Sequence, residues 1–115
     1  MVVVACNSAA TVIQNLKGLA YNSSEIVEVI SPIVDLIATQ SKYTNIGIIG
    51  TRKTIGSGMF NKELASRNKL LNITARATPV LVPMIEDGFL DNDILFPVFD
   101  RYFEGFDNCE LIIPA

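Results

Sequence analysis

The residue with the most chemical potential in this chain is Cys6, which follows a short apolar run and precedes Asn7 and Ser8. A cysteine between a strand and the first turn of a helix lies beside free backbone N–H groups and the positive end of the helix dipole, and both favour a thiolate. Such a thiolate could act as a base or a nucleophile. Two other interpretations stay open: Cys6 as a small buried packing residue, and Asn7 and Ser8 as ordinary N-cap residues.

Several common site types are excluded by composition and spacing. The chain of 115 residues contains no histidine, so it cannot form a Ser-His-Asp site. The segment 50–54 (GTRKT) lacks the spacing of a phosphate-binding loop. The second cysteine, Cys109, is expected to begin a strand, at the edge of the sheet opposite to Cys6, and to serve in packing. Because neither cysteine has companions at metal-ligand spacing, we expect no metal site.

Charge and hydropathy limit the partners. The formal net charge is −3, from charged residues scattered along the chain, so we expect neither nucleic acid nor a membrane as a partner. The apolar run at 2–5 is too short for a signal peptide or a membrane span. Two widely spaced cysteines favour a reducing compartment, and we therefore expect a soluble, cytoplasmic protein.

Short β-branched runs alternate with segments of helical period, which predicts an α/β fold with a parallel sheet. The predicted strands are 2–5, 26–30, 45–49, 72–77 and 109–113. The predicted helices are 8–20, one starting at Ser31 and Pro32, 52–68, 80–87 and 91–105, the last with a kink or a delayed start at Pro97. In open α/β sheets ligands bind beyond the carboxyl ends of the strands. The residues expected there include Cys6, Thr51 and Thr78.

Three segments resemble motifs of the glutamate racemases, which belong to the aspartate/glutamate racemase superfamily. Residues 3–10 (VVACNSAA) are similar to V-A-C-N-T-A, with Ser8 in place of the common threonine. Residues 48–57 (IIGTRKTIGS) resemble I-G-T-x-x-T-v-x-S, and residues 77–88 (ATPVLVPMIEDG) resemble A-x-P-L-x-V-P-L-x-E-x-G. Residues 110–115 resemble the strand that precedes the second catalytic cysteine. The family's D-S-G-x-G-G and P-Y-G segments are missing, so the resemblance implies an internal fragment.

The resemblance also implies a fold and a chemistry. The family has two facing α/β lobes, so residues 1–30 would be a βαβ portion of the first lobe and residues 31–115 most of the second, with the Ser31–Pro32 turn as the crossing point. The implied reaction converts L-glutamate to D-glutamate for peptidoglycan synthesis, with two thiols and without pyridoxal phosphate, metal or other cofactor. The implied roles are a catalytic thiol for Cys6, substrate binding for Asn7 and Ser8, and support from Thr51, Thr54 and Glu86.

Two alternatives remain beside this interpretation. One is a racemase of aspartate or another amino acid, because the residues present do not read the length of the substrate side chain. The other is a non-catalytic α/β domain that binds a small anion or a protein. Under the fragment interpretation we expect the isolated chain to be inactive. We also expect it to self-associate, since apolar faces that the missing parts would cover are left exposed.

Overall fold

The computed structural model describes residues 1–13, 25–40 and 42–115. Over these residues the chain is an α/β fold in which every strand pairing is parallel, as the sequence predicts. Strands β1 (Val2–Val4) and β2 (Ile26–Glu28) form a two-stranded sheet. Strand β3 (Asn45–Gly50) is the centre of a three-stranded sheet, between β4 (Asn72–Ala77) and β5 (Leu111–Pro114).

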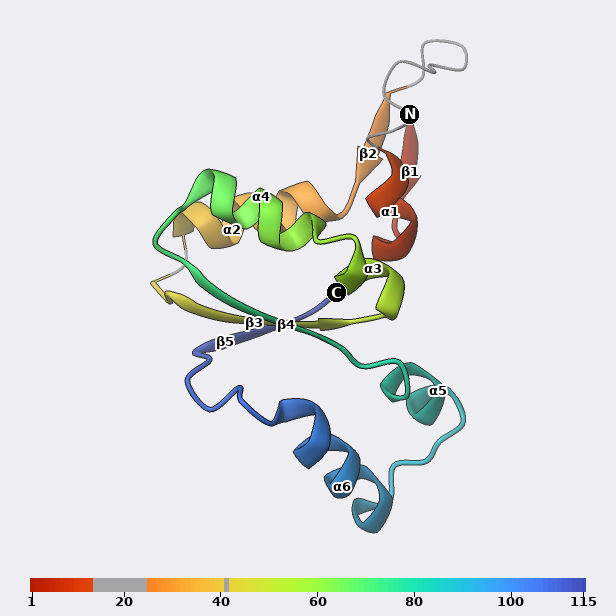
Figure 1. The fold of residues 1–115 in the computed structure, drawn as a ribbon. Helices are drawn as coiled ribbons and strands as arrows, with labels where there is room; N and C mark the ends of the chain where they lie inside the picture. Colours follow the sequence, from red (N-terminus) through yellow and green to blue (C-terminus); the bar gives the residue numbers. More distant parts are fainter. Residues whose placement is uncertain (14–24, 41) are drawn as a thin grey trace.

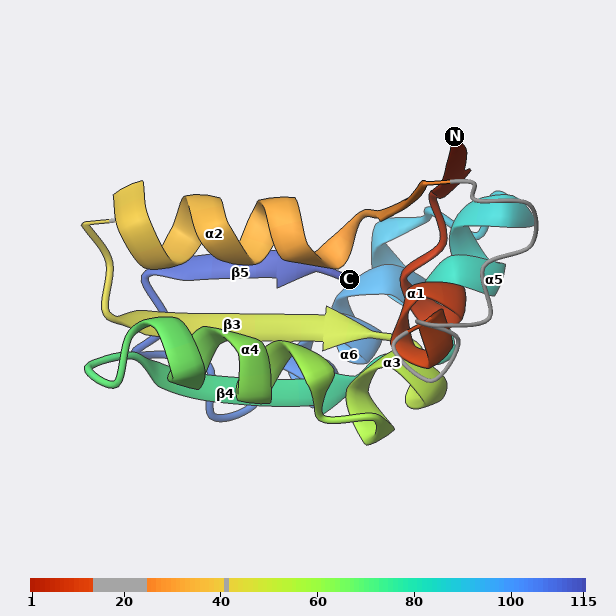
Figure 2. The ribbon, with the colours of Figure 1, turned by 90° about the horizontal axis from the view of Figure 1, so that it is seen from above.

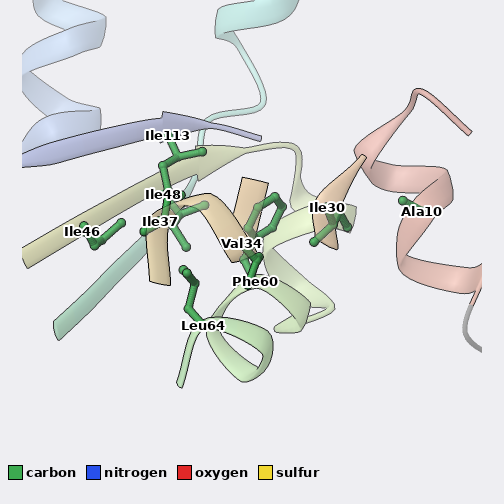
Figure 3. Close-up of a cluster of buried hydrophobic side chains, with 9 residues drawn as sticks. All are labelled: Ala10, Ile30, Val34, Ile37, Ile46, Ile48, Phe60, Leu64 and Ile113. Atoms are coloured by element: carbon green, nitrogen blue, oxygen red, sulfur yellow. The ribbon is translucent and has the colours of Figure 1, made fainter. Parts of the chain in front are cut away.

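The core lies on one face of the three-stranded sheet. Helices α2 (Ile30–Gln40) and α4 (Met59–Arg67) cover this face (Figures 1 and 2). Ile46 and Ile48 of the central strand are fully buried beneath the two helices because alternate residues of a strand point to the same face. Figure 3 shows the buried cluster, which consists of Ala10, Ile30, Val34, Ile37, Ile46, Ile48, Phe60, Leu64 and Ile113.

The opposite face of this sheet is covered more thinly. Helices α5 (Leu81–Glu86) and α6 (Asn92–Phe103) lie on that side in Figure 1. The buried ring of Phe106 packs directly against Gly47, where a Cβ atom would approach the ring to 2.8 Å. Helix α6 has no fully buried residue, and the side chain of Ile94 on this helix is exposed, so the helix is only partly covered.

The two-stranded sheet and helix α1 (Asn7–Ile13) stand beside the main sheet (Figure 1). Five of the six residues in these two strands are β-branched, yet most of the side chains are exposed. Ala10 of α1 is buried and joins the main core cluster. The apolar contact therefore reaches from α1 into the core, while β1 and β2 remain largely uncovered.

The start of α2 corrects the prediction for this region. The predicted strand 26–30 ends at Glu28, and the helix begins at Ile30 rather than at a Ser31–Pro32 turn. The backbone N–H groups of Ile30 and Ser31 donate to the Glu28 carboxylate, so this carboxylate, and not the Ser31 hydroxyl, caps the helix. A carboxylate at a helix N-terminus satisfies free N–H groups and complements the dipole.

One other predicted helix is divided in two, and two others begin within one residue of their predicted start. The predicted helix 52–68 is two helices, α3 (Arg52–Gly56) and α4, because Gly58 adopts a left-handed conformation with φ of 64° between them. Helix α6 continues through Pro97 as one helix and starts at Asn92, before this proline. Helix α1 is described to Ile13, and the rest of the predicted helix 8–20 lies outside the described residues.

Candidate active site

Cys6 lies immediately beyond the carboxyl end of β1, at the start of α1. Its carbonyl oxygen accepts a hydrogen bond from the Ala10 N–H at 2.8 Å, which ties Cys6 into the first turn of the helix. Its side chain is exposed, and this contradicts the alternative in which Cys6 is a buried packing residue. Asn7 and Ser8 follow in the first turn of α1 and are half-buried. The thiol is therefore open to a small molecule.

Three of the predicted site hydroxyls meet in one cluster, formed by Ser8, Thr51 and Thr54. The Ser8 Oγ atom lies 2.8 Å from Thr51 Oγ1 and 2.9 Å from Thr54 Oγ1, and the two threonine oxygens are 3.0 Å apart. The cluster joins α1 to α3, which follow two different sheets. The structure thus brings together residues that are more than forty positions apart in the sequence.

Each threonine of the cluster is positioned by the local structure at the end of β3. Thr51 is the N-cap residue of α3, and its hydroxyl oxygen accepts from the Thr54 N–H at 3.1 Å. This bond satisfies one of the free N–H groups of the first helical turn. Thr54 is only 1% exposed, so its hydroxyl depends on the cluster for its hydrogen bonds.

A pocket of about 140 Å³ opens at the carboxyl ends of the three-stranded sheet. Its lining is Ile49, Gly50, Thr51, Thr78, Leu81, Val82, Ile85, Pro114 and Ala115. Thr51 belongs to both the pocket and the hydroxyl cluster. Thr78 is buried, and its N–H donates to the Gly50 carbonyl at 2.8 Å, which holds the start of α5 against the end of β3. The apolar residues of α5 that line this pocket are not among the residues predicted from the sequence. Their position shortly after β4 could have indicated them, because ligands bind beyond the carboxyl ends of the strands.

Glu86 is not brought into this cluster. It is the last residue of α5, its side chain is exposed, and no described residue hydrogen-bonds its carboxylate. Its assistance to a thiol therefore stays a prediction.

Cys109 lies at the opposite edge of the main sheet. It precedes β5, which begins at Leu111 rather than at the predicted 109, and the neighbouring Glu110 N–H donates to the Asn45 carbonyl at the start of β3. Thr51, the cluster residue, follows the end of β3. At 3.3 Å per residue, β3 separates these two edges by roughly 17 Å. Cys109 therefore does not face Cys6 across a shared substrate.

The described residues contain no group of three His, Cys, Asp or Glu side chains that could hold a metal ion. No helix in the described part of the chain is long and apolar enough to cross a membrane.

The described residues form an α/β fold with a candidate site at the strand ends, and comparison with known proteins finds similarity to glutamate racemases. The chain is 33% identical over 107 residues to the glutamate racemase of Aquifex pyrophilus. The structure of an Aquifex pyrophilus glutamate racemase matches 97% of the chain with a TM-score of 0.78 and 30% identity. A glutamate racemase from Bacillus anthracis matches 97% of the chain with a TM-score of 0.82 and 27% identity. No protein-family model matches the chain.

A glutamate racemase from Francisella tularensis, solved in complex with D-glutamate, shares the fold with a TM-score of 0.81 at 23% identity. The chain spans about 41% of the length of the Aquifex pyrophilus racemase and 42% of the Bacillus anthracis chain. By sequence and by fold, the chain corresponds to a segment of the glutamate racemases.

Proposed function

We propose that this chain supplies one thiol half of a glutamate racemase site, with Cys6 as the acid–base group. The observation that carries the proposal is the exposed Cys6 thiol at the carboxyl end of β1, in a chain whose relatives are glutamate racemases. The carboxyl edge of a parallel sheet is where α/β proteins bind their ligands.

The proposed chemistry is proton transfer at the α-carbon of glutamate. The Cys6 thiolate removes the α-proton from one face, or the thiol returns a proton to that face in the reverse direction. The intermediate carbanion is high in energy because the α-proton is only weakly acidic. Hydrogen-bond donors near the substrate carboxylate must therefore stabilise its negative charge. The Asn7 amide is the nearest side chain along the chain that could supply such a donor. The reaction needs no pyridoxal phosphate and no metal.

Inversion requires a second proton donor on the opposite face of the α-carbon. The chain contains two cysteines, and Cys109 lies at the other edge of the main sheet. We therefore propose that the isolated chain holds half of the site and does not racemise glutamate. In this proposal the two sheets belong to the two lobes of the enzyme, with residues 1–30 in the first and 31–115 in the second.

The proposed substrate is glutamate, since one structural neighbour is a glutamate racemase that binds D-glutamate. The proposed setting is the cytoplasm, where D-glutamate is supplied for peptidoglycan and so for the cell wall and cell shape.

A chimera tests the proposal positively. The matching segment of the Aquifex pyrophilus glutamate racemase is replaced with this chain, and L-glutamate is incubated with the product in deuterated buffer. We expect D-glutamate that carries α-deuterium, measured by chiral chromatography and mass spectrometry. In the same chimera, Cys6→Ala should lower the rate by about 10³-fold or more, because two groups that act as a unit fail when one is removed.

The matched control is Cys109→Ala, which removes the other thiol of the chain and should leave the rate of the chimera unchanged. Circular dichroism shows whether each variant is folded. A folded chimera that is inactive, or a Cys6→Ala chimera that keeps the rate of its parent, would contradict the proposal.

A further inference from the structure

Arg76 on β4 holds the carboxyl end of helix α6 against the main sheet. Its Nη1 atom donates to the carbonyl oxygens of Arg101 and Tyr102, at 3.3 and 3.1 Å. Helix α6 ends at Phe103, so both carbonyls belong to its last turn, where backbone oxygens have no partner within the helix. A cation at this place also complements the helix dipole. Arg76 therefore caps α6 from strand β4.

The guanidinium group of Arg76 is itself held in place. It lies over the ring of Phe106, with 5.4 Å between the Cζ atom and the ring centroid, which is within the range of a cation–π contact. Phe106 is buried and packs against Gly47 of β3. Helix α6 has no fully buried residue of its own, and apolar contact has no preferred direction. The directional hydrogen bonds from Arg76 therefore set where the end of α6 lies.

Tyr102 carries this placement back to α5. Its carbonyl oxygen is one of the two that Arg76 binds, and its hydroxyl oxygen accepts a hydrogen bond from the Val80 N–H at 3.4 Å. Val80 is the N-cap residue of α5, and its side chain has no polar atom with which to cap the helix. The contacts from Arg76 to Tyr102 and from Tyr102 to Val80 thus join β4, α6 and α5. We call them the Arg76 clamp.

Helix α5 is one wall of the pocket at the strand ends, which is lined on this side by Leu81, Val82 and Ile85. Val82 and Ile85 are 51% and 63% exposed, so little packing fixes where they lie. The backbone bond from Thr78 to the end of β3 holds only the residues before the helix. The Arg76 clamp holds the start of the helix from the side of α6.

We propose that Arg76 is a positioning residue for the candidate active site. It is not among the residues that line the pocket, and it acts through Tyr102 on α5, which sets the distance between α5 and the ends of β3 and β5. This inference deepens the proposed function, on which it rests for the ligand that the pocket takes. A pocket wall holds the substrate but transfers no proton, so Arg76 should affect substrate affinity more than the chemical step.

Four variants separate the steps of the clamp. Arg76→Met removes the hydrogen-bond donors and keeps much of the length of the side chain, whereas Arg76→Lys keeps a cation. Tyr102→Phe removes only the hydroxyl group that reaches Val80. Arg101→Met is the matched control, because it removes an exposed cation next to Tyr102 whose side chain makes no hydrogen bond or ion pair with the described residues.

The first measurement is hydrogen exchange in the 115-residue chain. Arg76→Met should speed amide exchange by about tenfold in both α6 and α5, because two bonds from a charged donor are lost. Exchange in α4, on the other face of the sheet, should stay unchanged. Tyr102→Phe should speed exchange by about threefold in α5 and leave α6 unchanged, since Arg76 still caps that helix. Arg76→Lys should lie closer to the wild type than Arg76→Met, and Arg101→Met should change none of these rates.

The second measurement is steady-state kinetics of the racemase chimera. Arg76→Met should raise the KM for glutamate by about tenfold and change kcat by less than about threefold. A variant that is merely less stable leaves less folded enzyme, which lowers the apparent kcat and leaves KM unchanged. Tyr102→Phe should raise KM by a smaller factor, Arg76→Lys should restore most of the affinity, and Arg101→Met should keep the KM of its parent.

Wild-type exchange in α5 of Arg76→Met would overturn the inference. So would equally faster exchange in α4, which would show a general loss of stability, and so would an unchanged KM beside faster exchange in α5. If Arg76→Met does not fold, Tyr102→Phe tests the same clamp, and unchanged α5 exchange in that variant would overturn the inference. Hydrogen exchange needs no racemase activity. An inactive chimera would therefore count against the proposed function, while the exchange pattern still tests the Arg76 clamp.

Discussion

The strands of both sheets in this chain contain β-branched residues, but their surroundings are very different. Strand β3 (NIGIIG) is the middle of its sheet, and Ile46 and Ile48 are fully buried. Strand β1 (VVV) is equally apolar, yet Val3 is 57% exposed. Apolar β-branched residues predict a strand, but burial depends on what packs against that strand. The difference shows that the main sheet carries its own core, whereas the described part of the two-stranded sheet is linked to that core through Ala10 of α1 and Ile30 of α2.

Removing side-chain volume at the centre of each sheet should give the largest contrast. Ile48→Ala leaves a cavity under α2 and α4 and should lower the free energy of unfolding by about 2–5 kcal/mol. Val3→Ala, at an exposed position of β1, should cost less than about 0.5 kcal/mol. Urea denaturation followed by circular dichroism measures both. Equal losses in the free energy of unfolding for Ile48→Ala and Val3→Ala would contradict the view that only the main sheet carries a packed core.

Adding a methyl group tests how closely the central strand is packed. Gly47→Ala places a Cβ atom 2.8 Å from two carbons of the buried Phe106 ring and should cost about 1–3 kcal/mol. Gly56→Ala is the matched control, because a Cβ there meets nothing within 4 Å. Gly56 is the last residue of the short helix α3, so its replacement by alanine should stabilise the chain by about 0.5–1 kcal/mol. A Gly47→Ala variant with an unchanged free energy of unfolding would show that the Phe106 ring can move aside at little cost.

The exposed side chains on both faces of the two-stranded sheet should make the chain self-associate. Val2, Val3, Ile26 and Val27 are each between 37% and 57% exposed, and contiguous apolar surface favours association. Val3→Lys should shift the equilibrium toward monomer, measured by analytical ultracentrifugation at several concentrations. Ile112→Lys, on β5 of the main sheet, is the control at a comparably exposed position and should shift it less. A wild-type chain that stays monomeric at every concentration would refute the expected association.

The smallest effect concerns the amino edge of the main sheet. The Glu110 carboxylate accepts hydrogen bonds from the backbone N–H groups of Asn45 and Thr44, which hold the pKa of Glu110 below its ordinary value of 4.5. Because the folded-state pKa is lowered, this stabilisation is present above the ordinary value and disappears as the pH falls through the folded-state pKa.

Glu110→Gln should therefore have a slightly lower melting temperature than the wild type at about pH 7, and the difference should shrink at about pH 3. The side chain is exposed, so the effect is small. Glu86→Gln is the matched control, because the Glu86 carboxylate is exposed and makes no hydrogen bond with the described residues. A melting-temperature difference for Glu110→Gln that does not change with pH would contradict this account of the edge.

Local signals predicted much of the fold. The predicted ranges of β3 and β4 agree with the structure to within a residue, because short runs that contain β-branched residues are bounded by turn residues. The break between α3 and α4 could not be predicted, since the left-handed turn at Gly58 depends on the packing of the helices around it. The Glu28 cap was a readable local signal, because the carboxylate stands two residues before the first helical residue.

The candidate site divides in the same way. The resemblance to the racemase motifs and the strand-end positions led to Cys6, Ser8, Thr51 and Thr54. That Ser8, Thr51 and Thr54 form one hydroxyl cluster could not be predicted, because the cluster joins helices that follow two different sheets and depends on their tertiary placement. The division into lobes at residue 30 and the role of Glu86 stay predictions.

Racemisation by the 115-residue chain itself is the most direct test of the claim that it holds half a site. L-glutamate is incubated with the purified chain in deuterated buffer, with the active chimera as the positive control, and the product is separated by chiral chromatography. The account predicts D-glutamate from the chimera and none above the protein-free blank from the chain, because no thiol faces Cys6. D-glutamate with α-deuterium from the chain alone, lost in its Cys6→Ala variant, would contradict the account.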